Sequence, residues 1–251
     1  MAACGFDVPL GAPAGRGGCI TVCMSGTETV SVIIPALNEA EHLARTVEMA
    51  ADPRAEIIVV DGGSQDATCD IARRCSARVL QSDSGRAAQM NFGARQARGQ
   101  ALLFLHADTV LPQHYCGTVL ETLAQPGIVA GAFRLGINAP GRSLRLIERS
   151  ANWRSAIFQL PYGDQALFLT APRFREIGGF ADLPIMEDFD LVRRLQRSGR
   201  IALAPDRVMT SGRRWRKLGP WKTTLINQWV ILRYLAGSSP EKLAEFYRKR
   251  R

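Results

Sequence analysis

The stretch "VSVIIPALNEA" at residues 30–40 joins an apolar, β-branched run to an abrupt polar turn. The run over residues 30–36 predicts a strand that is buried on both faces. Asn38 follows, with Glu41 three residues later, a spacing similar to a helix capping box in which Asn replaces Ser or Thr. Apolar residues then recur at helical spacing, at Leu43, Val47 and Ala50. The stretch therefore predicts a strand, a polar turn and a helix.

The same order of strand and helix continues to residue 106. Further strands are expected at "EIIVVD" (56–61), "ARVLQS" (77–82) and "ALLFLH" (101–106). Between them we expect a helix that contains Ile71 and another over "GRAAQMNFGARQARG" (85–99), ended by its last glycine. An alternation of roughly 20–25 residues is typical of right-handed βαβ crossovers. The chain is therefore expected to be an α/β protein with a parallel sheet.

Three polar clusters directly follow strands: "PALNE" (35–39), "DGGSQD" (61–66) and "HAD" (106–108). Ligands of open parallel sheets bind beyond the carboxyl ends of the strands, where these clusters would meet. The GxGxxG turn of a nicotinamide-dependent enzyme does not follow the first strand, and no GxxxxGK[ST] phosphate loop occurs. A ligand site is therefore expected at the three clusters, without a dinucleotide fingerprint or a P-loop.

Several segments, in order over about residues 30–215, resemble the family-2 glycosyltransferases of the GT-A fold. They are "VSVIIPALNEAEHL", "EIIVVDGGSQDAT", "GRAAQMNFGA", "LLFLHADT" and "IGGFADLPIMEDFDLVRRLQRSG". The resemblance implies a Rossmann-like, mostly parallel central sheet flanked by helices over residues 30–214, and a helical C-terminal tail over 215–251. It also implies inverting transfer of a single sugar from a nucleotide donor. Within the family, the chain is similar to a small bacterial subgroup often associated with arsenosugar or selenium-related gene sets.

On the donor side, Asp61 ends a strand beside Gly62 and Gly63, which let a ligand approach the backbone closely. Its carboxylate could accept hydrogen bonds from a uracil ring or from ribose; the alternative is that it only ends the strand and caps the next turn. Arg86 could neutralise a diphosphate, or it could be a solvated arginine. The donor is expected to be UDP-linked. The residues assigned to it are Pro35, Ala36, Asn38, Glu39, Asp61, Ser64, Arg86, His106 and Asp108.

The "HAD" cluster stands where many sugar-nucleotide transferases carry an Asp-x-Asp motif that binds Mg²⁺ or Mn²⁺. The resemblance implies that Asp108 is the metal ligand and that His106 takes the first position, although His106 could also simply pack the strand end. One carboxylate, two diphosphate oxygens and water can satisfy Mg²⁺, and the ion would neutralise charge on the leaving nucleoside diphosphate. Many relatives supply a further histidine downstream, whereas the last histidine here is His114. Arg213 or Arg214 could partly replace it by contacting phosphate.

The acidic run in "MEDFDL" (186–191) is assigned to the catalytic base. By resemblance, Asp188 removes the proton of the acceptor and Glu187 supports it. In-line displacement needs one carboxylate near the acceptor hydroxyl, opposite the leaving group, and no protein nucleophile. The alternative is that these acids only occupy the first turn of a helix, where its dipole stabilises them. Both interpretations can hold together, because the dipole also favours the ionised carboxylate.

The segment before the base, "LPYGDQALFLTAPRFREIGGF" (160–180), is expected by resemblance to face the acceptor, an unknown small molecule or a lipid. Contacts to the acceptor or to phosphate are assigned to Gly163, Asp164, Gln165, Arg213, Arg214 and Trp215.

The tail segment "WRKLGPWKTTLINQWVILRYLAG" (215–237) alternates basic and bulky apolar residues. Leu225, Trp229 and Leu232 recur at helical spacing. Two interpretations stay open: peripheral contact with a membrane interface, or a helix that packs on the catalytic domain or pairs two subunits. We prefer the second. Under the first, the side chains at headgroup level would be Trp221, Trp229 and Tyr234.

Bulk properties limit the possible partners. The chain has 251 residues, and 32 Lys and Arg against 23 Asp and Glu give a formal net charge of +9. This length allows a core without disulfides or a structural metal, and the charge favours anionic partners. No nucleic-acid partner is expected, because no recognition-helix, OB or RRM signature occurs and aromatic residues are only 7%. Phosphate on the substrate explains the charge more simply.

The six cysteines form no CxxC pair and no zinc-ligand spacing, so reduced thiols and a cytoplasmic location are expected, at the inner face of the membrane if the tail binds lipid. Residues 1–29 are rich in Gly, Ala and Pro and lack periodicity, so they are interpreted as disordered, with Met24 as an alternative start. The alternative function is a non-catalytic sugar-nucleotide-binding or scaffold protein on the same fold, which would need neither Asp108 nor Asp188.

Overall fold

Strand β1 (Val30–Ala36) lies inside an eight-stranded sheet, and both of its faces are buried. Val30, Val32 and Ile34 pack into a hydrophobic cluster on one face, and Ile33 packs into a second cluster on the other. Burial on both faces explains the nearly unbroken apolar run.

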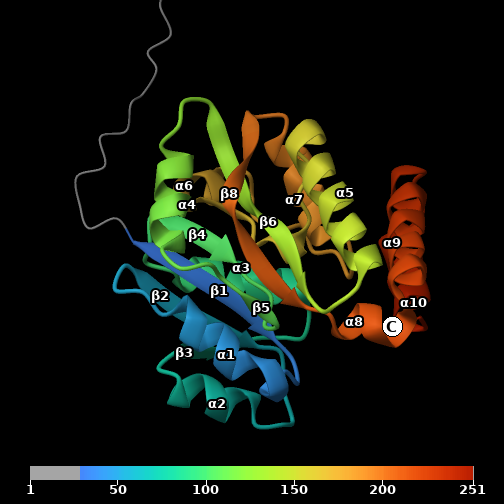
Figure 1. The fold of residues 1–251 in the computed structure, drawn as a ribbon. Helices are drawn as coiled ribbons and strands as arrows, with labels where there is room; N and C mark the ends of the chain where they lie inside the picture. The colour runs from blue at the N-terminus through green and yellow to red at the C-terminus, as the bar shows by residue number, and fades with distance from the viewer. Residues whose placement is uncertain (1–28, 251) are drawn as a thin grey trace, which may run out of the picture.

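The structure is a computed structural model that describes residues 29–250 (Figure 1). The expectation of a disordered N-terminal extension therefore lies outside the described residues, apart from Thr29.

The strands and helices of the first half are β1, α1 (Ala40–Ala50), β2 (Ala55–Asp61), α2 (Thr68–Arg74), β3 (Arg78–Gln81), α3 (Arg86–Gln96), β4 (Ala101–Phe104), β5 (Thr109–Val110) and α4 (Tyr115–Leu123). Those of the second half are β6 (Ile128–Asn138), α5 (Arg142–Phe158), the 3₁₀ turn η1 (Gly163–Gln165), β7 (Phe168–Thr170), α6 (Ala171–Glu176), α7 (Glu187–Leu195), β8 (Arg200–Ser211), α8 (Arg213–Leu218), α9 (Pro220–Leu235) and α10 (Pro240–Arg248). Every strand and helix expected up to residue 106 is present.

The strands of the sheet follow the order β3-β2-β1-β4-β7-β6-β8-β5. The parallel pairs are β1 with β2, β1 with β4, β2 with β3, and β6 with β8. The antiparallel pairs are β4 with β7, β6 with β7, and β5 with β8. The sheet is therefore mostly parallel, as expected. The carboxyl ends of β1, β2 and β4 meet at one edge, which brings the three polar clusters to the same side of the sheet.

Helices cover both faces of the sheet. Helices α1, α2 and α4 pack on one hydrophobic cluster, and α3, α6 and α7 pack on the other. Helix α3 approaches the sheet very closely at Gly93, where a Cβ would lie 2.6 Å from Cγ2 of Ile33 and 2.9 Å from Cγ2 of Val60. A larger residue at this position would push the helix, and Arg86 at its first residue, away from the sheet.

Two local expectations are wrong. Asn38 does not cap α1: its backbone is left-handed, with φ of 54°, and its Oδ1 accepts a 2.9 Å hydrogen bond from the backbone N–H of Gln65. The side chain therefore ties the turn after β1 to the turn after β2. Helix α3 ends at Gln96, before Gly99. The backbone N–H of Gly99 instead donates to Oγ of Ser31 at 2.8 Å, so Gly99 packs against the beginning of strand β1.

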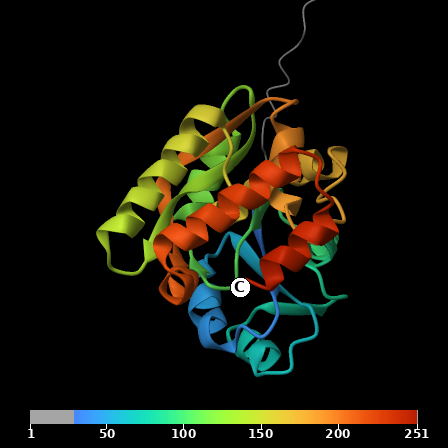
Figure 2. The same ribbon diagram turned by 90° about the vertical axis from the view of Figure 1, so that its right-hand side faces the viewer.

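The C-terminal helix α9 lies beside α5 on one side of the molecule, and α8 and α10 pack on α9 (Figure 2). Helices α9 and α10 pack on the start of α7 through a hydrophobic cluster that contains Met186, Phe189, Val230 and Leu243. The tail therefore packs on the domain, as the preferred interpretation expected, and the opposite side of α9 is exposed. No helix within residues 29–250 is both long and apolar enough to cross a membrane.

Candidate active site

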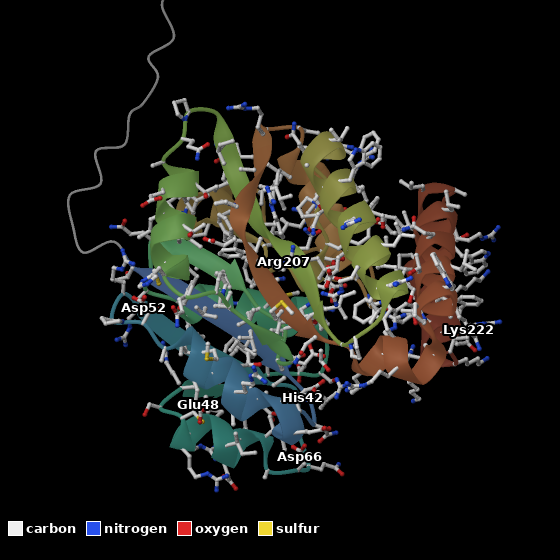
Figure 3. All side chains as sticks on the ribbon, in the orientation of Figure 1. His42, Glu48, Asp52, Asp66, Arg207 and Lys222 are labelled. Atoms are coloured by element: carbon white, nitrogen blue, oxygen red, sulfur yellow. The ribbon has the colours of Figure 1, made fainter. Side chains whose placement is uncertain are left out.

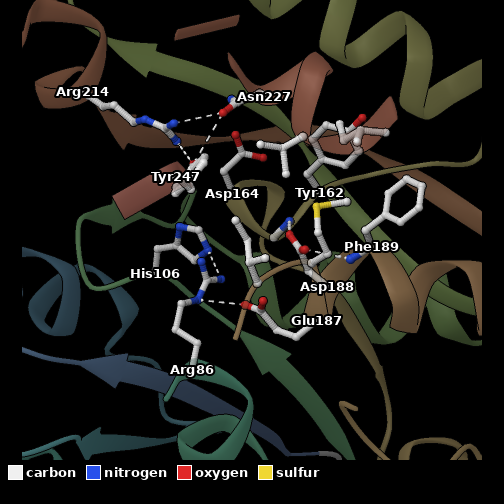
Figure 4. Close-up of a pocket in the computed structure, with 15 residues that line it drawn as sticks. Arg86, His106, Tyr162, Asp164, Glu187, Asp188, Phe189, Arg214, Asn227 and Tyr247 are labelled. Carbon is white, nitrogen blue, oxygen red and sulfur yellow. Dashed lines mark hydrogen bonds and ion pairs between the residues drawn. The ribbon is translucent and has the colours of Figure 1, made fainter. Parts of the chain in front are cut away.

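A cavity of about 200 Å³ lies at the carboxyl edge of the sheet, where segments distant in sequence meet (Figure 4). Its charged and polar lining comes from the start of α3, the residues after β4, the turn η1, the first turn of α7 and the C-terminal helices. These lining residues are Arg86, His106, Tyr162, Asp164, Glu187, Asp188, Arg214, Asn227 and Tyr247. The structure thus brings the expected base, one donor-side arginine and the histidine of "HAD" into one cavity.

Asp188 is held from two sides in the first turn of α7. Its Oδ2 accepts a 2.6 Å hydrogen bond from the backbone N–H of Gly163, and its Oδ1 accepts a 2.7 Å bond from the backbone N–H of Phe189. These two hydrogen bonds fix the orientation of the carboxylate at the wall of the cavity. The position in the helix and the place in the cavity, offered as alternatives by the sequence, therefore occur together.

Arg86 links the base region to the strand end. Its Nε lies 3.2 Å from Oε1 of Glu187, and its Nη2 lies 2.7 Å from Nε2 of His106. Since the guanidinium has only donors, Nε2 of His106 is the acceptor of this bond. Glu187 is 4% exposed, and burial, together with the neighbouring Asp188 carboxylate, raises its pKa although Arg86 acts in the opposite direction. Arg86 is therefore an ion-pair partner and not only a solvated arginine.

Gly163 lies at the most crowded point of the cavity. A Cβ at this position would lie 2.8 Å from Oδ2 of Asp188, 3.1 Å from Nη2 of Arg86 and 3.2 Å from Nε2 of His106. Three polar side chains thus converge on a point that only glycine leaves open.

Asp164 places a carboxylate in the same cavity. Its Oδ1 is enclosed and has no hydrogen-bond partner among the described residues. Burial raises its pKa to about 6; the guanidinium of Arg154 opposes this shift and the charge of Asp188 adds to it. Asp164 therefore offers an acceptor to a hydroxyl or amino group that enters the cavity.

Two expected acceptor contacts are wrong. Gln165 is fully buried behind the cavity, where its Nε2 donates to the carbonyl of Phe133 at 3.0 Å and its Oε1 accepts from Oγ of Ser155 at 2.7 Å. Trp215 packs against the cluster of β6 and α5 that includes Leu135. Both side chains stabilise the fold, and neither lines the cavity.

Asp108 does not share the cavity of His106, although only one residue separates them. It lines a neighbouring cavity of about 480 Å³ with His42. Nη2 of Arg213 lies 3.6 Å from Oδ2 of Asp108 and 3.0 Å from Oε1 of Glu39. Burial and the charge of Glu39 raise the pKa of Asp108, while Arg213 lowers it. The two carboxylates therefore share one cationic partner.

The oxygen ligands that Asp108 and Glu39 could offer fit a cation that takes most of its ligands from the substrate and from water. Within residues 29–250, no three His, Cys, Asp or Glu side chains gather into a metal cage. Asp108 and Glu39 nevertheless form a partly buried pair of carboxylates around a positive charge, which suits a hard cation with oxygen ligands. Diphosphate oxygens and water would have to complete its coordination.

The turns after β1 and β2 hold each other in place. Asp61 is 1% exposed, and its carboxylate accepts hydrogen bonds from the backbone N–H groups of Gly63 and Ser64 at 3.1 Å. In this structure the carboxylate of Asp61 therefore caps the turn after β2, which was the alternative to a direct contact with the nucleotide. Oγ of Ser64 accepts from the backbone N–H of Asn38 at 2.9 Å. Pro35 and Ala36 are buried strand residues, and the carbonyl of Ala36 already accepts hydrogen bonds from the backbone N–H of Gly62 at 3.0 Å and from Nε2 of Gln89 at 2.9 Å.

The cavity also contains residues that the sequence did not indicate. Tyr162 lies under Arg154, whose guanidinium carbon is 3.5 Å from the centre of the ring. Arg214 donates to the hydroxyl of Tyr247 and, at 3.0 Å, to Oδ1 of Asn227. Arg214 was expected near phosphate, whereas Tyr247 lies in α10, where no site residue was expected. The amphipathic pattern of the tail was a signal that it packs, but not a signal of where.

Comparison with known proteins identifies a glycosyltransferase family and similar glycosyltransferases. The model described as glycosyl transferase family 2 matches residues 31–176. Glycosyltransferase AglE of Haloferax volcanii is 35% identical over 111 residues, which cover 39% of this chain and 36% of that protein. The chain thus spans little more than a third of that relative's length.

Two solved structures superpose over most of the chain. Mannosyltransferase PcManGT from Pyrobaculum calidifontis, in complex with GDP-Man and Mn²⁺, has a TM-score of 0.59 at 18% identity and covers 86% of this chain and 68% of that one. Glucosyl-3-phosphoglycerate synthase from Mycobacterium tuberculosis, in complex with Mn²⁺, UDP and glucosyl-3-phosphoglycerate, has a TM-score of 0.55 at 20% identity and covers 73% and 71%. At these identities the superpositions show a shared fold, and the expected GT-A architecture is confirmed.

Proposed function

Because this chain belongs to glycosyl transferase family 2, we propose that it transfers one sugar from a nucleotide sugar to an acceptor that enters the cavity at Asp188. The observation that carries the proposal is the geometry of this carboxylate. Two backbone N–H groups fix it at the wall of a cavity that also contains Arg86 and His106. An ionised, oriented carboxylate is what deprotonation of an acceptor hydroxyl requires.

The roles of the residues follow from their contacts. Asp188 takes the proton of the acceptor, and Glu187 holds Arg86 at the donor side through their 3.2 Å ion pair. The second arm of Arg86 contacts His106, so one side chain connects the base region with the end of β4. Attack by the activated hydroxyl opposite the leaving nucleotide inverts the anomeric carbon and needs no protein nucleophile.

The donor is proposed to be a UDP-sugar, held by the turns after β1 and β2. The two superposed structures contain different nucleotides, UDP in one and GDP-Man in the other. The titration described below distinguishes between a uridine and a guanosine donor. Asp108, with Glu39 beside it, is proposed to hold Mg²⁺ or Mn²⁺, in line with the Mn²⁺ of both relatives. The bound ion would offset negative charge on the leaving diphosphate. The acceptor is proposed to be a small molecule or a lipid.

Calorimetric titration of UDP, GDP and dTDP, with and without Mn²⁺, tests the donor site. We expect one nucleotide to bind, to require the metal, and to lose most of its affinity in Asp108→Asn. Asp70→Asn, an exposed acid on α2, is the matched control and should bind as the wild type does. If no nucleotide binds to the folded protein, a scaffold role replaces the proposed enzyme.

A further inference from the structure

Helix α9 exposes a stripe of large apolar side chains on the side opposite to its packed face. Its buried residues are Thr223, Ile226 and Val230. Trp221, Leu225 and Leu232 point away from them and are 56%, 68% and 65% exposed; Trp229 and Leu235 extend the stripe. Side chains of this size at four- and three-residue spacing form one continuous face of a helix.

Helix α5 lies beside α9 and adds a second exposed stripe (Figure 2). Its buried residues Leu144, Ile147 and Ala151 pack on β6. The opposite side of the helix exposes Leu146, Trp153 and Ile157, followed by Phe158 at its end. The exposed apolar residues of the two helices are called the α5–α9 face below. They are Leu146, Trp153, Ile157, Phe158, Trp221, Leu225, Trp229, Leu232 and Leu235.

The exposed charges on these two helices are all positive. Helix α9 contains no Asp or Glu, and its exposed charged residues are Lys222 and Arg233; Lys222 projects from the outer edge of the molecule (Figure 3). Helix α5 exposes Arg142 and Arg149. Its one acid, Glu148, is buried, where it accepts a hydrogen bond from the backbone of β6 and pairs with Arg145. The neighbouring α8 adds Arg216 and Lys217.

Charge decides which partner suits this face. A second copy of the chain would bring the basic residues of two α9 helices together, on molecules that each carry +9. An anionic bilayer would instead pair these residues with negatively charged lipid headgroups, which attract Lys and Arg near the surface. Trp and Leu side chains could then enter the interface, where indole rings are favoured. The pattern is that of an interfacial helix with basic flanks.

We propose that the α5–α9 face docks this protein on the surface of an anionic membrane. The inner side of α9 supplies Asn227, Val230 and Ile231 to the wall of the cavity, so docking through the outer side would place the cavity next to the membrane surface, with α9 between them. The proposal goes beyond sugar transfer and does not depend on it, because vesicle binding is measured without a donor.

Co-sedimentation of the full chain with vesicles tests the docking. We expect binding to phosphatidylcholine vesicles that contain phosphatidylglycerol, at least tenfold weaker binding to phosphatidylcholine alone, and a blue shift of tryptophan emission on binding. The double variant Leu225→Ser/Leu232→Ser should lower the affinity at least tenfold. Both side chains are mostly exposed, so the fold is retained, and unchanged thermal unfolding verifies this. Met49→Ser, an exposed apolar residue on α1, is the matched control and should bind as the wild type does.

Three outcomes would overturn the proposal. The first is no binding to phosphatidylglycerol vesicles. The second is binding that the double variant retains, which would mean adsorption through charge alone. The third is a dimer in sedimentation velocity that the double variant abolishes, which would make the face a contact between two copies.

Discussion

The backbone N–H of Gly163 donates a 2.6 Å hydrogen bond to Oδ2 of Asp188, and it joins the turn η1 to the first turn of α7. Asp188→Asn keeps an acceptor for this bond but removes the base. We expect kcat to fall by about 10²–10⁴-fold, the usual contribution of a general base, with nucleotide affinity unchanged. Asp190→Asn, in the same helical turn but outside the cavity, should retain most of the activity. Equal losses in the two variants would mean that these acids act only through the helix dipole.

Gly163→Ala should displace the base without unfolding the protein. The added methyl group would lie 2.8 Å from Oδ2 of Asp188, so the carboxylate must move away from the acceptor. A misplacement of about 1 Å in a reacting group can cost on the order of 10²-fold in rate. We expect such a loss in kcat with little change in Tm. Gly117→Ala on α4, where the nearest atom is 3.7 Å away, should leave kcat unaltered. An active Gly163→Ala enzyme would show that Asp188 tolerates movement and is not the base.

Arg213→Gln should raise the affinity of the protein for Mn²⁺ in the absence of nucleotide. The arginine lies 3.6 Å from Asp108 and 3.0 Å from Glu39, where it competes with a metal ion for both carboxylates. Its removal leaves two negative charges without their partner, and we expect roughly tenfold tighter binding, or about 1.4 kcal/mol. Mn²⁺ titration followed by electron paramagnetic resonance measures this directly. The gain should disappear in Arg213→Gln/Asp108→Asn; if it persists, the metal binds elsewhere.

Asp164→Asn should change how stability depends on pH. Burial raises the pKa of Asp164 from 3.8 to about 6, so the folded protein binds a proton that the unfolded chain releases between these values. This group therefore stabilises the wild type below about pH 4, and that stability is lost as the pH rises through 6. The shift corresponds to roughly 2–3 kcal/mol.

The Asn variant should accordingly unfold several degrees above the wild type at pH 7.5 and at a similar temperature at pH 4. Asp83→Asn, an exposed acid outside the cavity, is the control. A difference between Asp164→Asn and wild type that stays constant across this range would show that the carboxyl of Asp164 keeps its ordinary pKa in the folded state.

Local sequence predicted the first half of the sheet well because β1 and β4 are buried on both faces and β2 is buried toward its end. Ile33 and Ile34 pack on opposite sides, so the apolar run is required by the fold itself. The motif resemblance assigned Asp188 to the base and Arg86 to the donor, and the structure places both at one cavity. The assignment of Gln165 to the acceptor was wrong. In the sequence, a polar residue after a turn has the same appearance whether its side chain faces a ligand or bonds to buried backbone groups, as Gln165 does.

The separation of His106 and Asp108 could not be predicted from their spacing. Two residues in an extended segment would share a face, but the chain turns after β4, and each side chain enters a different cavity. Asn227 and Tyr247 were missed for another reason. Their place depends on how α9 and α10 pack on α7, and such tertiary contacts leave only a general amphipathic pattern in the sequence.

The cavity wall contributed by α9 and α10 has a consequence for the order of events during synthesis. Arg86 and His106 leave the ribosome long before Tyr247, because Tyr247 follows them far along the chain. A nascent chain can form the sheet and the donor turns while the acceptor side is still open to water. The cavity can therefore close only after α9 and α10 have been made and have packed on α7, and until then the side chain of Asp188 would face water.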